Sequence, residues 1–212
     1  NVPALTITDS VSVSSGKALI GWKKNTSSDT KGYIIYHLKN GIWIPIDTVL
    51  GINNTAYAAS DSGVSTASQS YRIAAFDSCK NTSPMGDIHN SVFLASTLDI
   101  CKGEINLSWN DYINWNTGLS GYQIFVSENG SAFELIDSTK SNLTNYSHTG
   151  LQRLSSYCYF VRVVDSSGQK TASSNTTCLL ASLPQAPQFI YLKTATVTVN
   201  NKVRIDCHAD TA

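Results

Sequence analysis

The chain has 212 residues, with 15 Lys and Arg against 15 Asp and Glu, so its formal net charge is zero. Phosphate binding needs a basic face, which a chain without excess positive charge does not favour. The charge balance therefore argues against a nucleic-acid partner or an anionic membrane surface. Hydrophobic residues make up 42% of the chain, and no apolar run approaches the roughly 18 residues of a membrane span. Helical periodicity is nearly absent, so the composition predicts an all-β fold.

The first unit of the chain reads as short alternating segments separated by turns. Trp22 ends an apolar segment at residues 20–22, and Tyr33 follows a glycine in the segment 32–36. Asn40-Gly41 predicts a two-residue hairpin turn, because both turn residues need positive φ. Further segments contain Tyr57 and Tyr71. Alternation of this kind predicts a β-sandwich whose core holds Trp22, Tyr33 and Tyr71.

The same features return in the same order in the second half of the chain. Trp109, Tyr122, Asn129-Gly130, Tyr146 and Tyr157 match their counterparts in the first half. The spacing is about 90 residues, the length of one seven-stranded sandwich module. We therefore expect a tandem repeat, with Trp109, Tyr122 and Tyr157 buried and the Tyr157 hydroxyl bonded to the corner before its strand.

These repeats divide the chain into three parts. We expect modules at residues 1–96 and 97–184 and the start of a third module at 185–212, where alternation resumes on both sides of Asn200-Asn201. Cys207 falls where Trp22 and Trp109 stand in the earlier modules. The sequence therefore predicts a first hairpin of a truncated third module, with Cys207 as a free thiol.

Cys158 and Cys178 are equidistant from Gly168, which lies in a predicted hairpin turn. Two residues placed in this way face each other across the strand pair, on the same side of the sheet. Tyr157 and Tyr159 point inward, so Cys158 points outward and a cross-strand disulfide is expected. Five cysteines in a chain of this kind indicate an oxidising compartment.

The order Trp, Gly-Tyr-x-Ile, Thr-x-Tyr and Tyr-x-(Ile/Tyr) resembles the fibronectin type III module, twice, over residues 1 to about 184. Residues 77–84, 157–162 and 174–178 are further similar to tandem modules of Bacteroidetes surface proteins that stand upstream of a gliding-motility-type secretion domain. The resemblance implies two immunoglobulin-like sandwiches in an extracellular or cell-surface protein, with the bacterial outer surface as the expected location.

The same resemblance implies a second disulfide, between Cys79 and Cys101. In an end-to-end rod Cys79 lies at the entry pole of module one and Cys101 lies beyond its exit pole, so the bridge requires the start of module two to fold back along module one. Such a bridge would lock the angle between the modules. The alternative is that Cys79 carries a free thiol.

The sequence offers little that could carry chemistry. The four histidines share no spacing, no Cys-x-x-Cys occurs, and no catalytic or phosphate-binding motif is present, so we expect no metal, cofactor or catalytic site. The notable exception is the loop at residues 110–116, which carries Tyr112 and Trp115. These rings could bind a sugar or peptide, but the loop belongs to the pole that faces module one, which favours interdomain packing.

The expected function is therefore that of a non-catalytic, rigid extracellular spacer or an adhesion and protein-interaction module. Its expected partners are a protein or glycan at the cell surface and the adjacent modules of its own chain. The alternative is a set of carbohydrate- or partner-binding accessory modules from a larger secreted enzyme. A cytokine-type receptor ectodomain is the weakest alternative, because the Trp-Ser-x-Trp-Ser motif is absent.

Overall fold

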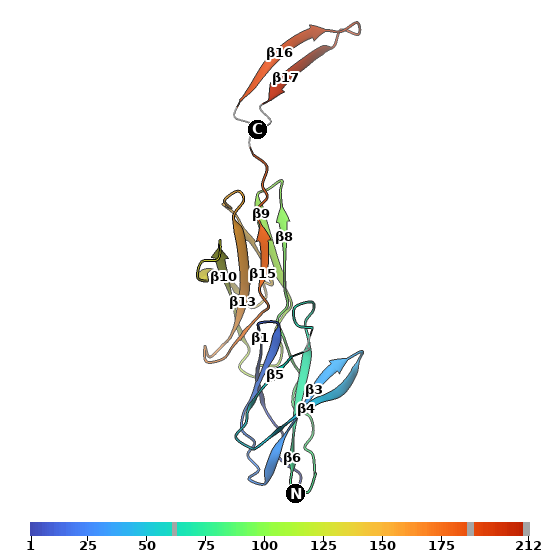
Figure 1. Ribbon diagram of the computed structural model, residues 1–212, viewed down its shortest axis with the longest axis vertical. Helices are drawn as coiled ribbons and strands as arrows, with labels where there is room; N and C mark the ends of the chain where they lie inside the picture. Colours follow the sequence, from blue (N-terminus) through green and yellow to red (C-terminus); the bar gives the residue numbers. More distant parts are fainter. Residues whose placement is uncertain (61–62, 186–188, 210–212) are drawn as a thin grey trace.

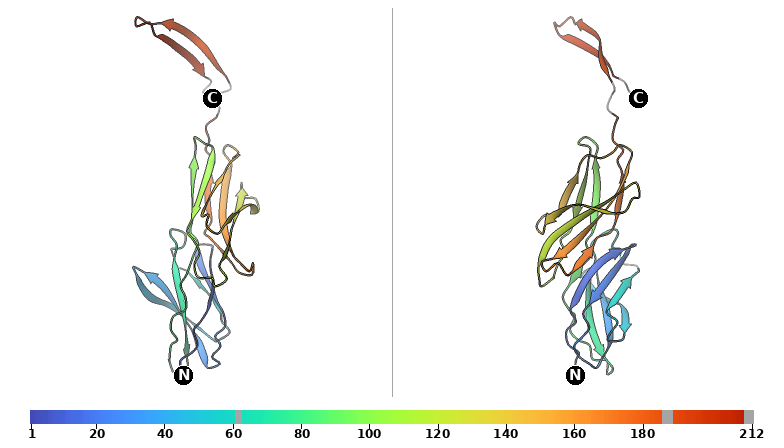
Figure 2. Two further views of the ribbon diagram at one scale, coloured as in Figure 1. Left: turned by 180° about the vertical axis from the view of Figure 1, so that it is seen from behind. Right: turned by 90° about the vertical axis from the view of Figure 1, so that its left-hand side faces the viewer.

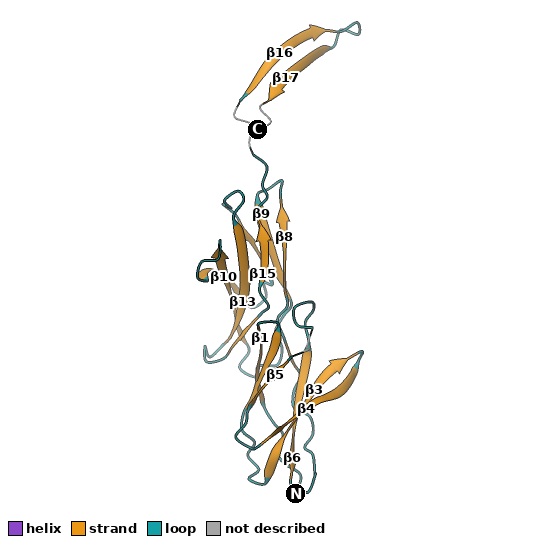
Figure 3. Cartoon of the chain, in the orientation of Figure 1, coloured by secondary structure: helices purple, strands orange, loops and turns teal. Residues whose placement is uncertain are grey.

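The structure is a computed structural model that describes residues 1–60, 63–185 and 189–209. Over these residues the regular secondary structure consists of β-strands, with no helix (Figure 3). Two β-sandwiches and a hairpin follow one another along the long axis, with the N-terminus at the end of the first sandwich (Figures 1 and 2). The predicted all-β fold with two tandem sandwiches is confirmed.

The first sandwich packs the sheet β1-β2-β5 on the sheet β4-β3-β6-β7. Its strands are β1 (Thr8–Ser14), β2 (Lys17–Trp22), β3 (Thr30–Lys39), β4 (Ile42–Leu50), β5 (Ala56–Ala59), β6 (Ser70–Asp77) and β7 (His89–Asn90). Asn40 and Gly41 close the β3–β4 hairpin with φ of 51° and 78°. The predicted core residues Trp22, Tyr33 and Tyr71 are buried, so this part of the prediction is confirmed.

The second sandwich packs the sheet β12-β9-β8 on a sheet built from β11, β10, β13, β14 and β15. Its strands are β8 (Leu94–Asp99), β9 (Glu104–Trp109), β10 (Leu119–Glu128), β11 (Glu134–Lys140), β12 (Asn145–His148), β13 (Ser156–Asp165), β14 (Thr171–Ser173) and β15 (Thr177–Leu180). Trp109, Tyr122 and Tyr157 are buried as predicted. The Tyr157 hydroxyl accepts a hydrogen bond from the Gln152 N–H at 2.8 Å, which is the expected tyrosine corner.

The last strand of the second sandwich is interrupted between β14 and β15, a feature that the alternation does not predict. Asn175 lies in this break and is buried. Its side-chain oxygen accepts from the Leu94 N–H at 2.7 Å, and its amide donates to the Leu94 carbonyl at 3.0 Å. The break thus satisfies the backbone of β8 and joins the two sheets at one edge.

The expected boundary between residues 96 and 97 falls inside β8. All of β8, from Leu94 to Asp99, pairs with β9 of the second sandwich. The second sandwich therefore begins before Leu94. The last regular strand of the first sandwich, β7, is correspondingly short, with two residues.

The Cys158–Cys178 disulfide predicted from the hairpin geometry is formed. Cys158 and Cys178 are direct partners in the β13–β15 register, and their Cα atoms are 4.0 Å apart. Outward placement on the sheet follows from strand alternation, because Tyr157 and Tyr159 on either side of Cys158 are buried.

The second expected disulfide is not formed, and this prediction is corrected: Cys79 and Cys101 are both exposed free thiols. Strand β6 runs away from the contact between the two sandwiches toward Cys79. Strand β8 runs away from the same contact in the opposite direction, toward Cys101. Strand β6 is eight residues long and β8 is six residues long. Because the two strands extend in opposite directions, the thiols lie on the order of 40 Å apart. The second sandwich continues the axis of the first instead of folding back along it.

The hairpin at the far end consists of β16 (Ile190–Val197) and β17 (Val203–Ala209). Asn201 lies in its turn with φ of 54°. Cys207 pairs with Leu192 across the strands and carries a free, exposed thiol, as expected. Residues 186–188 and 210–212 of the third predicted part lie outside the described residues.

Candidate functional site

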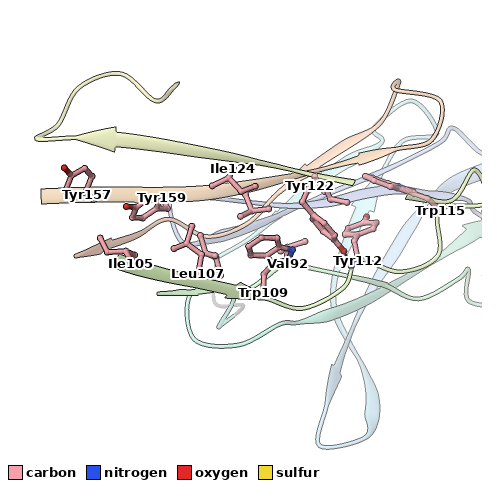
Figure 4. Packing of buried hydrophobic residues seen from close by; sticks show 14 of the residues in the cluster. Val92, Ile105, Leu107, Trp109, Tyr112, Trp115, Tyr122, Ile124, Tyr157 and Tyr159 are labelled. Carbon is pink, nitrogen blue, oxygen red and sulfur yellow. Dashed lines mark hydrogen bonds between the residues drawn. The ribbon is translucent and has the colours of Figure 1, made fainter. Parts of the chain in front are cut away.

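The loop at residues 110–118, between β9 and β10, reaches the first sandwich and carries both aromatic residues singled out from the sequence. Side-chain hydrogen bonds help to hold this loop to its own sandwich. The Tyr122 hydroxyl donates to the Asp111 carboxylate at 3.3 Å, and the Thr117 hydroxyl donates to the Asp165 carboxylate at 2.8 Å. Figure 4 shows that the core of the second sandwich runs from Tyr157 at one end to Tyr112 and Trp115 of the loop at the other.

Asp165 fixes the base of this loop. Its carboxylate accepts from the Ser167 hydroxyl and from the Lys170 N–H as well as from Thr117. These hydrogen bonds, the one from Ser167 foremost, hold the pKa of Asp165 well below its usual range. The loop is therefore anchored by a carboxylate that stays ionised throughout the physiological range.

Tyr112 lies at the centre of the contact between the sandwiches and is 2% exposed. Its hydroxyl oxygen accepts the Val11 N–H of β1 at 3.0 Å and lies 3.0 Å from Nδ1 of His89 in β7. A phenol has one proton to donate, so the arrangement is satisfied when the hydroxyl donates to a neutral His89 ring. One side chain of the second sandwich thus joins two strands of the first.

Burial shifts both ionisable groups of this pair toward their neutral forms. It raises the pKa of Tyr112. Burial, assisted by the positive charge of Lys170, lowers the pKa of His89 to about 4, against the opposing effect of Asp87 and Asp9. Both side chains are therefore uncharged at neutral pH, as a hydrogen bond in a dry interface requires.

Trp115 completes the aromatic centre of the contact. Its indole N–H donates to the Asp9 carbonyl of β1 at 2.6 Å, and the residue is 5% exposed. Its ring lies 4.3 Å from that of Tyr112, centroid to centroid, and is tilted by 38°. The two rings pack on each other and both bond to the backbone of one strand in the other sandwich.

A polar rim surrounds these rings. The Lys170 ammonium lies 3.5 Å from the Asp9 carboxylate. Asn90 donates to the Asp111 carbonyl at 2.7 Å and accepts from the Ile113 N–H at 2.9 Å. An aromatic centre with a hydrogen-bonded rim is the anatomy of a specific protein interface, here formed within one chain.

The sequence leaves two roles open for Tyr112 and Trp115, namely ligand binding and interdomain packing. Both rings are buried against the first sandwich, and neither presents a surface to a soluble partner. The geometry therefore supports interdomain packing. We name this set of contacts the junction: Asp9, Val11, His89, Tyr112 and Trp115.

Sequence reasoning did not identify Asp9, Val11 or His89 as junction residues. Asp9 and Val11 contribute backbone groups, which leave no trace in the side-chain pattern. His89 lies close to the expected boundary between the modules. That position is the feature of the sequence that could have marked His89 as a junction residue.

The described residues bring together no cluster of His, Cys, Asp and Glu side chains that could hold a metal ion. Over the same residues no helix is both long and apolar enough to cross a lipid bilayer. The three free thiols and the disulfide lie away from the junction, with Cys79 and Cys101 in turns, Cys207 in β17 and Cys158–Cys178 on the outer sheet face.

The fold and the junction define a tandem of two β-sandwich modules. A family model described as "Interferon-alpha/beta receptor, fibronectin type III" matches residues 89–182. That match begins at His89 and spans the second sandwich, which agrees with a boundary that precedes β8.

Two solved structures are among those that match the chain. The FN1–FN3 domains of chicken CNTN1 are 17% identical and match with a TM-score of 0.36, over 85% of this chain and 68% of that chain. Pectate lyase Pel3 from Pectobacterium carotovorum is 18% identical, with a TM-score of 0.35, over 46% of this chain and 28% of that chain. A search of curated proteins finds no match to the chain.

Proposed function

We propose that the chain is a rigid extracellular arm that spaces and presents binding surfaces in protein interaction or adhesion, and that it catalyses no reaction by itself. The observation that carries this proposal is the junction. Two buried aromatic rings with backbone hydrogen bonds across the contact hold the sandwiches in one orientation, and an arm that transmits position needs such a joint.

Two further observations support an extracellular location. The Cys158–Cys178 disulfide is formed, and bonds of this kind persist in oxidising compartments. Fibronectin type III-like modules commonly mediate interactions between proteins. Together with the resemblance to surface proteins of Bacteroidetes, they favour a bacterial outer surface, where a protein or glycan would be the partner.

Small-angle X-ray scattering of the purified chain tests the rigid arm. We expect one elongated envelope with a fixed angle between the sandwiches. Trp115→Ala should broaden the distribution of angles, because removing a buried tryptophan costs about 3–5 kcal/mol. The matched control is Trp43→Ala, which removes a tryptophan from the outer strand β4, away from the junction.

A wild-type scattering curve that requires many interdomain angles would contradict the rigid arm. Non-catalytic function has a separate test. Turnover of a polysaccharide or peptide by the purified chain, lost on changing one carboxylate, would contradict it.

A further inference from the structure

A cluster of aromatic rings lies on the outer face of the second sandwich, outside its core and separate from the five junction residues. Phe160 of β13 alternates with the buried Tyr159 and Val161, so it points outward. It is the direct register partner of Phe125 in β10, and the two rings stack at 4.6 Å with an angle of 4°. Phe133 packs edge-on against Phe160 at 4.9 Å and is 42% exposed.

Arg162 stands next to this cluster on the same face of β13. Its guanidinium lies 4.8 Å from the centre of the Phe125 ring and 5.7 Å from that of Phe160. None of the ion pairs among the described residues includes Arg162. Aromatic rings therefore hold a half-buried cation in place while its hydrogen-bond donors are not engaged by a carboxylate.

A cleft of about 420 Å³ opens at this point, with walls from both sandwiches. Phe133, Phe160 and Arg162 line one side, and Ser15 in the β1–β2 turn of the first sandwich lines the other. Hydroxyl and amide groups of the break between β14 and β15 line its end. The junction creates this cleft, because it holds the β1–β2 turn against the second sandwich.

The lining of the cleft combines one cation with neutral side chains. Arg162 is the charged member of the lining, and the other side chains are aromatic, aliphatic or small, or carry a hydroxyl or amide group. Arginine and aromatic residues at the centre of a hydroxyl-rich rim are the composition of a protein-binding hot spot. A planar guanidinium, already oriented by stacking, is suited to bind a carboxylate through two parallel hydrogen bonds.

We infer that this cleft docks an acidic segment of a partner polypeptide, with an Asp or Glu carboxylate on Arg162 and a neighbouring apolar side chain on Phe133. The inference rests on the proposed function and names the chemistry of its partner. An acidic polysaccharide fits the cleft less well. The faces of Phe125 and Phe160 are used by each other and by Arg162, so they offer no open platform for a sugar ring.

The test is selection of a random dodecapeptide library on the whole chain, with counter-selection on Arg162→Gln. We expect enrichment of peptides that place Asp or Glu beside an apolar residue. The best peptide should lose at least about tenfold in affinity with Arg162→Gln, a change of about 1.4 kcal/mol. Arg162→Lys should also weaken binding, because an ammonium cannot form the bidentate pair.

Arg153→Gln is the matched control, since it removes an arginine at the opposite pole of the same sandwich, where its guanidinium donates to the Leu183 carbonyl. Affinity should be unchanged in this variant. Amide NMR shifts on peptide addition should concentrate on β13 and the β14–β15 break, and Phe133→Ala should reduce them without altering the fold.

Three results would overturn the inference. In the first, the selected peptides bind Arg162→Gln as tightly as they bind the wild type. In the second, the selected peptides are not enriched in Asp or Glu. In the third, the chain binds oligogalacturonate but none of the peptides. None of these results would contradict the proposal of a rigid arm, because the scattering envelope of Arg162→Gln should match that of the wild type. Conversely, a flexible arm would appear in the wild-type scattering before any peptide is added.

Discussion

The Tyr112 hydroxyl is the most informative atom to remove from the junction. Tyr112→Phe keeps the ring and its contact with Trp115 but deletes the acceptor of the Val11 N–H and the partner of His89. Val11 is fully buried, so its N–H has no solvent to replace the lost acceptor. Leaving such a donor unpaired costs about 1–3 kcal/mol, and the second lost bond adds about 1 kcal/mol.

We therefore expect Tyr112→Phe to weaken the docking of the two sandwiches by about 2–4 kcal/mol. Each sandwich keeps its own core, so its far-ultraviolet circular dichroism should not change. Residual dipolar couplings measured by NMR report the relative orientation of the two sandwiches. They should fit one alignment tensor in the wild type and two different tensors in the variant.

The matched control is Tyr146→Phe, which removes a hydroxyl from β12, outside the junction. A single alignment tensor should be retained there. If Tyr112→Phe also retains one tensor and the wild-type free energy of unfolding, the Val11 N–H has found another partner. The account of the junction as a hydrogen-bonded joint would then be wrong.

Three other outcomes follow from the structure. Because the folded pKa of His89 is about 4 and the unfolded value about 6.5, stability should be full above pH 6.5 and fall by up to about 3 kcal/mol as the pH drops to 4. Chemical denaturation across this range checks it, and His89→Gln should flatten the dependence. Changing Cys158 and Cys178 together to Ser should lower the free energy of unfolding by about 3 kcal/mol in the absence of reductant. If the double variant unfolds like the wild type, the disulfide does not constrain the unfolded chain. Mass spectrometry after alkylation without reductant should find three labelled cysteines, namely Cys79, Cys101 and Cys207. A single labelled cysteine would instead support the Cys79–Cys101 bridge.

The sequence predicts the sandwiches well because their determinants are local and repeated. Trp22 and Trp109 fill equivalent core positions, and the Asn-Gly turns fix the register of the hairpins that follow Tyr33 and Tyr122. The Cys158–Cys178 pair followed from symmetry about one turn, which is also a local property.

The errors arise where the relation between modules decides the outcome. The Cys79–Cys101 pairing depended on the direction of the second sandwich relative to the first. That direction is set by backbone groups of Asp9 and Val11, which the side-chain pattern does not reveal. The aromatic face around Arg162 was missed for a related reason, since Phe125 and Phe160 belong to different strands that pair in the folded sheet.

The Cys158–Cys178 bridge also determines how the second sandwich would yield if the arm were stretched between its two ends. The cysteines are 20 residues apart in the sequence and joined covalently. Under tension the chain between them is bypassed, so it cannot lengthen when the sandwich opens. About 70 Å of contour length, at roughly 3.5 Å per residue, is thereby withheld from extension. Opening of the second sandwich would thus lengthen the arm by a shorter step than opening of the first, and a pulling force would displace its outer end less.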